Sequence, residues 1–378
     1  MDKIFFVLLT FAISFTIGWI TIPKIVVISK IKRLFDKPDE RKVHKKEISR
    51  LGGVSFVPAL MISVSLVIGM RYYLQQPIPM ISEVSFITEF MFLLSASFII
   101  FFIGLTDDLV GVSYKTKFLV QIISATLIAF TGLVPTTLFG LFGIHEINPI
   151  ITGLLVVVAI VFIINAYNLI DGVDGLCSGL SSVALFALGA WFTYIEGFIY
   201  AMIAMGMLGV LIAFFYYNIS SKRLKIFMGD TGSLTLGLLI SFLGLKFLQT
   251  ASTYTPMGEH SFIQSIHSPL AIIIGLLFIP IFDTLRVFTG RIMQRKSPFA
   301  PDKTHIHHKM LALGFTHIQS TITLIISQIG FVLLNLLLGE VLLLNINTIL
   351  LIDIVIAVSI NVIINKQINA RTNKALNK

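Results

Sequence analysis

Long apolar stretches alternate with short polar segments along most of the chain. We identify eleven stretches that are about long enough to cross a bilayer core of roughly 30 Å: 4–28, 52–70, 86–105, 118–134, 150–168, 177–195, 199–217, 231–248, 269–288, 320–338 and 341–365. In lipid, backbone polar groups are paired only within helices or closed barrels. The pattern therefore predicts an all-α, polytopic integral membrane protein with about eleven transmembrane helices.

The composition supports this prediction, because 56% of the residues are hydrophobic and only 12% are charged, whereas soluble domains carry about 25% charged residues. The first stretch exceeds the apolar region of a signal peptide and lacks a small-residue cleavage site, so we expect it to be the first transmembrane helix. Residues 1–366 are expected to form a single transmembrane domain, followed by a basic tail at 367–378. The single cysteine, Cys177, excludes an intramolecular disulfide.

Basic residues gather on alternate polar segments. Of the 28 Lys and Arg residues, 24 lie on one side of the predicted membrane, and the opposite loops at 71–85, 135–149 and 249–268 carry only Arg71. The positive-inside rule then places the N-terminus outside and the C-terminus in the cytosol. The net charge of +9 reflects this bias and favours anionic lipids and substrates. Nucleic acid is not an expected partner, because no basic, aromatic-rich module lies outside the predicted spans.

Polar residues that interrupt the apolar stretches fall on the predicted cytosolic side. They comprise Asp107 and Asp108 after the third stretch, Asn165, Asn168, Asp171 and Asp174 around the end of the fifth, Asp230 at the start of the eighth, and His305, His307 and His308 after the ninth. Ionisable groups at membrane depth are costly and suggest a functional site.

Each group also has a simpler explanation. Asp230 precedes the sequence TGS and is equally compatible with a helix N-cap. Asp171 and Asp174 are three residues apart and share one face of a helix or turn, but an isolated pair of this spacing often marks only a turn. Adjacent Asp107 and Asp108 repel each other unless a cation compensates them, so a structural role is less favoured for this pair.

The histidines allow two chemistries. A zinc site is one, although no cysteine accompanies the HIHH sequence; binding of an anion is the other and agrees better with the lysines on either side. His44 lies among basic residues that the membrane topology alone would explain. Carboxylate and amide oxygens suit Mg²⁺, and His, Lys and Arg suit phosphate oxygens. Together they predict phosphoryl transfer from a soluble, nucleotide-activated donor to a lipid phosphate.

Several motifs resemble those of the polyprenyl-phosphate N-acetylhexosamine-1-phosphate transferase superfamily. They are DKPDERKVH (36–44), RLGGVSF (50–56), GLTDDL (104–109), NAYNLIDGVDGL (165–176), IFMGDTGS (226–233) and SPFAPDKTHIHH (297–308). The resemblance implies a catalytic domain with cytosolic active-site loops in the bacterial cytoplasmic membrane. It also implies transfer of a sugar-1-phosphate from a UDP-sugar to undecaprenyl phosphate, with release of UMP.

The resemblance further assigns roles to individual residues. Asp230 matches a ligand of Mg²⁺, for which Mn²⁺ is an alternative, and Asn168 matches an amide at that ion. Asp107 and Asp108 match a catalytic pair that assists the acceptor phosphate, although a phosphate that is already anionic does not require a base. The residues expected to bind substrate are Asp171, Asp174, Phe227, Lys117, Arg291, His44, His305, His307 and His308.

Two segments depart from the family pattern. The run NISSKRLKIFMGD is longer than in relatives and lacks a proline, which leaves the role of Asn218 open, and KKEISRLGG lacks a proline that relatives often carry. The HIHH sequence is similar to the corresponding motif of the GlcNAc-1-phosphate transferases that begin O-antigen, teichoic acid or capsule synthesis. UDP-GlcNAc is therefore the expected donor, and another UDP-N-acetylhexosamine is the alternative. Related enzymes can be dimers, but nothing in the spans indicates an interface.

Two other classes agree less well with the sequence. CDP-alcohol phosphotransferases carry a longer contiguous motif of which DGVDGLCSGL (171–180) has only the first half. A cation-coupled transporter would place its carboxylates near the bilayer midplane in broken, repeated helices, whereas the carboxylates here lie at helix ends.

Overall fold

The computed structural model describes residues 3–34, 48–75, 83–219, 223–254, 266–296 and 304–376, which form a helical bundle. The helices are α1 (Lys3–Lys32), α2 (Phe56–Tyr73), α3 (Glu83–Val110), α4 (Tyr114–Ala129), α5 (Pro149–Ile170), α6 (Leu176–Tyr194), α7 (Phe198–Ile219), α8 (Gly229–Ser252), α9 (Pro269–Met293), α10 (Ile306–Ala312), α11 (His317–Leu336) and α12 (Ile346–Leu376). Short 3₁₀ turns lie at Gly52–Ser55 and Leu141–Gly143, and a π-helical turn lies at Leu337–Val341.

Ten of the described helices are long and apolar enough to cross a membrane, which confirms the prediction of a polytopic membrane protein. The count differs from the eleven predicted stretches because the stretch at 118–134 forms α4, a helix of 16 residues. At 1.5 Å per residue this helix is about 24 Å long, shorter than the bilayer core. Beyond it, Gly132 adopts a positive φ of 80° and Pro135 disfavours continuation of the helix.

The core of the bundle is built around α8, whose apolar window is 89% buried. Its first turn and a half is rich in Gly, Ser and Thr, which lets neighbouring backbones approach closely. At Gly104 of α3, for example, a Cβ would lie 2.6 Å from the Cα of Thr231. Buried hydroxyls of α8 donate to carbonyls one turn earlier, as Thr235 does to Thr231, so these polar groups are satisfied inside the apolar core.

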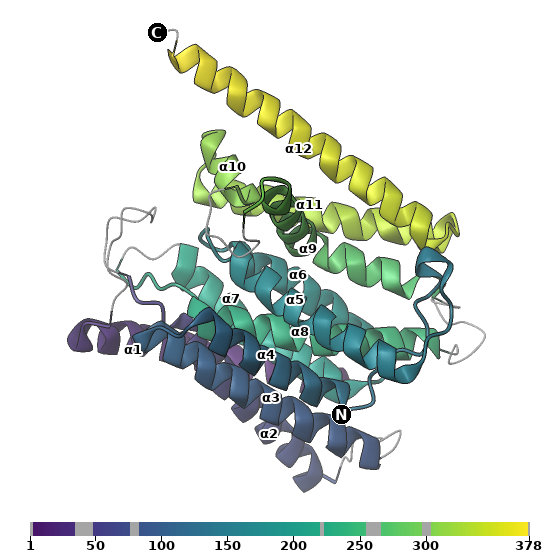
Figure 1. Ribbon diagram of the computed structural model, residues 1–378. Helices are drawn as coiled ribbons and strands as arrows, with labels where there is room; N and C mark the ends of the chain where they lie inside the picture. The colour runs from purple at the N-terminus through teal and green to yellow at the C-terminus, as the bar shows by residue number, and fades with distance from the viewer. Residues whose placement is uncertain are drawn as a thin grey trace.

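The helices are arranged in layers (Figure 1), with α1 to α3 on one side, α5 to α8 in the middle and α9 to α11 on the other side. Helix α12 crosses obliquely over the outside of the last layer. It continues to Leu376, so residues 367–376 extend the helix rather than forming a separate tail.

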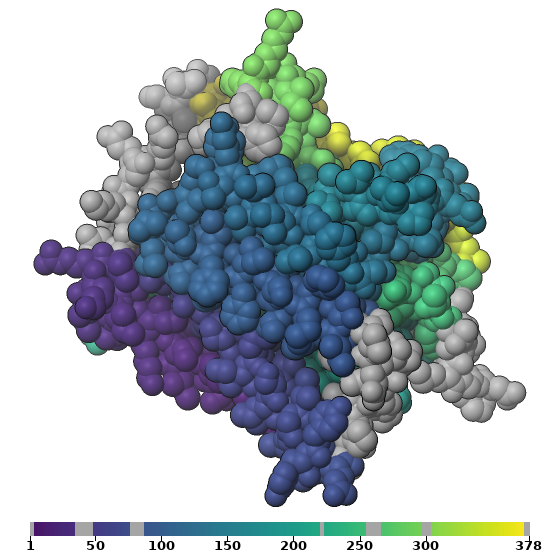
Figure 2. Space-filling model, turned by 60° about the horizontal axis from the view of Figure 1, so that its bottom comes forward, coloured from purple at the N-terminus to yellow at the C-terminus, as the bar shows by residue number. Residues whose placement is uncertain are grey.

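The outer surface of the bundle is apolar, as lipid contact requires. On α5 the residues Ile150, Leu154 and Val158, spaced one helical turn apart, are 75%, 65% and 64% exposed. Figure 2 shows the face formed by the N-terminal helices, where α3 and α4 (blue) lie beside α1 (purple) and α12 (yellow) is visible only behind them.

Candidate active site

The acidic end of α3 is joined to the start of α8. Both carboxylate oxygens of Asp108 accept hydrogen bonds from this turn: Oδ1 from the backbone N–H of Asp230 at 2.8 Å, and Oδ2 from the backbone N–H and hydroxyl of Thr231 at 2.9 and 2.6 Å. The first N–H groups of a helix have no partner within the helix, and here a side chain from another helix satisfies them. Asp230 itself lies inside the first turn, and the N-cap position is Met228, so the alternative of Asp230 as an N-cap is wrong.

A glycine makes this junction possible. Gly229 adopts a positive φ of 72°, and a Cβ at this position would lie 2.1 Å from the carbonyl oxygen of Arg50 and 2.5 Å from Oδ2 of Asp108. A side chain would therefore be strained by the backbone and would also collide with both neighbours.

Lys117 at the start of α4 connects two carboxylates. Its ammonium group contacts Oδ2 of Asp107 at 3.2 Å and forms an ion pair with Oδ2 of Asp230. The other oxygen of Asp107 accepts the backbone N–H of Val112 at 2.7 Å, which closes the turn between α3 and α4. The lysine thus compensates Asp107 of the acidic pair together with Asp230, whereas Asp108 is bound by the first turn of α8.

The end of α5 completes the carboxylate cluster. The amide nitrogen of Asn168 donates to the hydroxyl of Ser233 at 3.0 Å, which leaves its amide oxygen as a potential ligand. Burial raises the pKa of Asp171 well above its ordinary value, and the carboxylates of Asp230 and Asp108 raise it further. A cation would relieve this accumulation of negative charge.

The oxygen ligands that the protein offers fit a Mg²⁺ ion that is held partly by the protein and partly by the substrate. Within the described ranges, no group of three His, Cys, Asp or Glu side chains could hold a metal ion by itself, so neither the zinc alternative nor an all-protein cage is supported. Mg²⁺ commonly takes only one or two carboxylates and completes its shell with water and substrate phosphates. Asp230 and the amide oxygen of Asn168 are compatible with such a site.

Asp174 is joined to two other elements. Its Oδ2 pairs with Lys225 at 2.6 Å and with Nδ1 of His317 at 3.1 Å, while its backbone carbonyl accepts the hydroxyl of Thr321 at 2.7 Å. Burial by itself would raise the pKa of Asp174, but the hydrogen bonds from His317 and Lys225 lower it overall. The side chain therefore secures the 171–175 loop to α11 and to the segment before α8.

Asn218 has a similar structural role, which the sequence left open. Its side-chain oxygen accepts the backbone N–H of Gly175, and its amide nitrogen donates to the carbonyl of Ile226 at 2.8 Å. Ile226 also forms a parallel bridge with Ser49. Asn218 is 5% exposed, so within the bundle it links the loop after α5 to the strand-like segment that leads into α8.

The histidine segment lies against the 171–175 loop. The ring of His307 packs on Gly172, where a Cβ would lie 2.3 Å from Nε2. Burial lowers the pKa of His307 to about 3, so at neutral pH this imidazole is uncharged and cannot bind an anion as a cation. The ring of His308 lies 4.3 Å from that of His307, centroid to centroid. His305 is 5% exposed and contacts Asp283.

Three further residues were predicted to bind substrate, and the two that the structure describes lie outside the carboxylate cluster and the histidine segment. The backbone of Phe227 pairs with Ser49 and Gly52, and its ring is half-buried. Arg291 is buried in the last turn of α9, with its guanidinium 6.0 Å from the centre of the Phe288 ring. His44 lies outside the described residues, so its expected role stays a prediction.

Sequence reasoning missed four residues that organise the site: Asn218 as a structural link, Lys225, His317 and Asp283. Membrane topology alone would explain the basic Lys225, and no motif of the sequence marks His317. Asp283 is the acidic residue of the otherwise mostly apolar α9. An acidic residue in such a stretch is itself a signal of function.

Comparison with known proteins supports the family resemblance of the sequence motifs. The profile described as glycosyl transferase family 4 matches residues 90–248. The chain is 31% identical over 346 residues to the probable undecaprenyl-phosphate N-acetylglucosaminyl 1-phosphate transferase of Bacillus subtilis, covering 85% of this chain and 82% of that protein. It is 30% identical over 291 residues to the undecaprenyl-phosphate alpha-N-acetylglucosaminyl 1-phosphate transferase of Salmonella typhi, covering 76% and 71%.

A mycobacterial relative extends the comparison. The decaprenyl-phosphate N-acetylglucosaminephosphotransferase of Mycobacterium tuberculosis is 28% identical over 313 residues, covering 78% of this chain and 73% of that protein. The matched span at 90–248 contains the α3–α4 turn, the end of α5 and the start of α8, which are the elements that form the carboxylate cluster. This chain therefore belongs to the polyprenyl-phosphate sugar-1-phosphate transferases of glycosyl transferase family 4.

Proposed function

We propose that this protein transfers N-acetylglucosamine-1-phosphate from UDP-GlcNAc to undecaprenyl phosphate. The names of the relatives support the acceptor class and the sugar. The observation that carries the proposal for this chain is the meeting of Asp107, Lys117 and Asp230 at the N-terminus of α8. The ammonium group of Lys117 brings a positive charge to this cluster, which favours a phosphate group beside it.

The reaction is an in-line displacement at phosphorus. An oxygen of the acceptor phosphate forms a bond to the phosphorus that carries the sugar, and the bond from this phosphorus to the bridging oxygen breaks. The bridging oxygen leaves with UMP, and the lipid retains a diphosphate linked to the sugar. The acceptor phosphate is an anion at neutral pH, so the step needs no base on the protein.

The side chains of the site position the substrates and neutralise the negative charge of their phosphates. A Mg²⁺ ion held by Asp230 and Asn168 would compensate negative charge on the diphosphate. Lys117 lies between Asp107 and Asp230, where its ammonium group can contact a phosphate oxygen. Asp108 positions the first turn of α8, because both its carboxylate oxygens accept hydrogen bonds from this turn.

The nucleotide is proposed to lie beside the 171–175 loop. Asp171 has no hydrogen bond or ion pair to its carboxylate among the described residues, whereas Asp174 has two ion pairs. Asp171 is therefore the more available of the two for donor binding. Phe227 follows Ile226, which Asn218 links to this loop. Its half-buried ring is proposed to stack on the base of the nucleotide.

The proposed orientation places this site in the cytosol. The segments on the predicted cytosolic side carry 24 of the 28 Lys and Arg residues, in agreement with the positive-inside rule. We infer a multi-pass protein of the bacterial cytoplasmic membrane that begins assembly of a cell-surface polysaccharide, with UDP-GlcNAc made in the cytosol as its donor.

Release of UMP by detergent-solubilised protein tests the proposal. The protein is supplied with undecaprenyl phosphate, a panel of UDP-sugars, and Mg²⁺ or EDTA. Lipid- and Mg²⁺-dependent release from UDP-GlcNAc is the expected result. Release only from another UDP-N-acetylhexosamine would retain the reaction and replace the donor, and no release from any donor would overturn the proposal.

A further inference from the structure

A buried carboxylate in α9 organises the histidine segment. Asp283 is 2% exposed, and its Oδ2 lies 2.8 Å from Nδ1 of His305. Its Oδ1 accepts the backbone N–H of Ile306 at 2.8 Å, the first residue of α10. One side chain of α9 thus contacts both the first histidine of the HIHH sequence and the start of the helix that carries the others.

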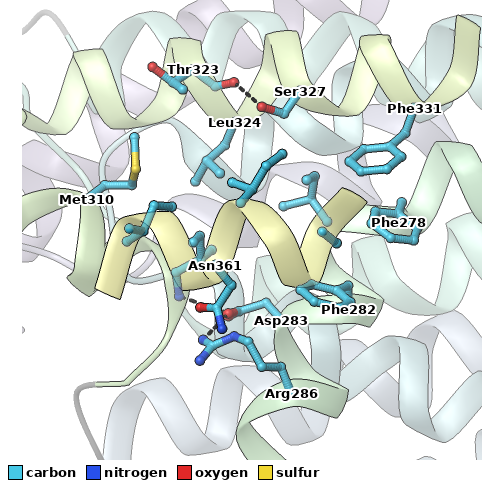
Figure 3. Close-up of a pocket in the computed structure, with 15 residues that line it drawn as sticks. Phe278, Phe282, Asp283, Arg286, Met310, Thr323, Leu324, Ser327, Phe331 and Asn361 are labelled. Carbon is cyan, nitrogen blue, oxygen red and sulfur yellow. Dashed lines mark hydrogen bonds and ion pairs between the residues drawn. The ribbon is translucent and has the colours of Figure 1, made fainter. Parts of the chain in front are cut away.

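Arg286 fixes the position of this carboxylate. Its guanidinium donates to Oδ1 of Asp283 at 2.7 Å and to the carbonyl of Thr304 at 2.6 Å. Figure 3 shows Asp283 and Arg286 together at one end of a pocket, whose other walls include the apolar side chains Phe278, Leu324 and Phe331. Water screens charge poorly in such surroundings, so the contact between Asp283 and His305 is stronger than it would be at the surface.

The partners of Asp283 determine where the hydrogen on His305 lies. Arg286 and the N–H of Ile306 both donate to the carboxylate, which is therefore an acceptor. Nδ1 of His305 must then be the donor, and Nε2 is the ring nitrogen left for a ligand. The ring of His305 is nearly parallel to that of His307, with centroids 5.7 Å apart, and His307 packs on Gly172 beside Asp171.

We propose that Asp283 is a positioning residue for the transfer reaction. Its carboxylate fixes the tautomer and orientation of His305, so that Nε2 faces the diphosphate of the donor. The inference rests on the proposed function, and it assigns a role to a residue outside the motifs that define the site. Since Asp283 acts through His305, its loss matters only while the imidazole is present.

A double-mutant cycle tests this dependence. The variants are Asp283→Asn, His305→Gln and the double variant, and kcat and KM for UDP-GlcNAc are measured from UMP release. The amide introduced by Asp283→Asn would still accept the N–H of Ile306 but would lack the charge. We expect each single variant to lose about 100-fold in kcat/KM, with a raised KM for the donor, and the double variant to lose little more than either one.

Two controls separate positioning from folding. Asp353→Asn makes the same change at a carboxylate of α12 that is fully buried and lies outside the site, so its kcat/KM should equal that of the wild type. If Asp283→Asn does not yield folded protein, the cycle is repeated with Asp283→Glu, which keeps the charge but displaces it from His305. Losses that multiply in the double variant would overturn the inference for Asp283, whereas a wild type that releases no UMP would overturn the proposed function instead.

Discussion

The carboxylate of Asp108 caps α8, whose first turn contains Asp230, and its Oδ1 lies 2.8 Å from the backbone nitrogen of Asp230. The two residues are separated by 122 positions in the sequence. The contact couples the acidic end of α3 to the turn that carries Asp230, beside which we propose the diphosphate binds. It also explains why one member of the Asp107–Asp108 pair faces α8 while the other faces Lys117.

This contact predicts graded losses of stability at position 108. Asp108→Ala would leave the N–H groups of Asp230 and Thr231 buried without their acceptor, at a cost of about 1–3 kcal/mol. Asp108→Asn retains one acceptor oxygen and should lose less. Thermal unfolding in detergent measures the order. Equal transition temperatures for all three proteins would show that the cap does not stabilise the bundle.

Asp230 should affect activity more than stability. Asp230→Asn keeps the backbone N–H that Asp108 accepts but removes the charge that pairs with Lys117 and is proposed to bind Mg²⁺. We expect UMP release to fall by about 100-fold or more, with a transition temperature near that of the wild type. Titration with Mg²⁺ checks the assignment, because an unchanged Mg²⁺ dependence would exclude Asp230 as a ligand.

The burial of His307 should make the stability of the folded protein depend on pH. Burial lowers its pKa to about 3 in the folded protein, whereas an unfolded histidine has a pKa of about 6.5. Stability from the neutral imidazole is therefore complete above about pH 6.5 and is lost as the pH falls toward 3, because only the unfolded chain takes up the proton. The loss is at most about 1.4 kcal/mol per pH unit.

The measurement is the transition temperature at about pH 7.5 and about pH 5.5, one unit to either side of the pKa of an unfolded histidine. His307→Asn should flatten this dependence. His145→Asn is a suitable control, since His145 lies on the loop between α4 and α5, away from the histidine segment. An identical pH dependence in wild type and His307→Asn would contradict the prediction.

Gly53 should tolerate no side chain. A Cβ there would lie 2.1 Å from the backbone nitrogen of Gly232, so Gly53→Ala must separate the 49–53 segment from the first turn of α8. We expect a loss of about 1–3 kcal/mol from overpacking together with reduced UMP release. Gly69→Ala is the matched control, because nothing lies within 4 Å of a Cβ at Gly69. In that helical position alanine should be neutral or slightly stabilising, and equal effects of the two changes would contradict the prediction.

Lys225 should act on donor binding through Asp174. Lys225→Met removes a partner 2.6 Å from the Asp174 carboxylate and keeps the contact with His317. The 171–175 loop would then be less well fixed, and we expect KM for the UDP-sugar to rise about 10-fold with a smaller change in kcat. The exposed Lys115 supplies the control variant Lys115→Met. A rise in KM that is equal in both variants would point to general electrostatic attraction rather than to the ion pair.

The class of fold was predictable, because lipid imposes strong constraints, and so was the grouping of acidic residues at helix ends. Long apolar stretches correspond to the ten described helices that are long and apolar enough to cross a membrane, and acidic residues such as Asp107 and Asp230 stood out because charges at membrane depth are rare. The α4 span was the exception: its apolar pattern runs past Ala129, but Gly132 and Pro135 end the helix early. Local backbone chemistry there outweighs hydropathy.

The sequence by itself determined a helical membrane protein with a phosphate-directed acidic site, since composition and motif spacing depend only on neighbours along the chain. Tertiary structure decided what each acidic residue does. Asp108, Asp174 and Asp283 accept donors from helices or segments that lie far away in sequence, whereas Asp171 has no such partner among the described residues. A carboxylate can cap a helix, form an ion pair or bind a ligand, and only its neighbours in space determine which of these it does.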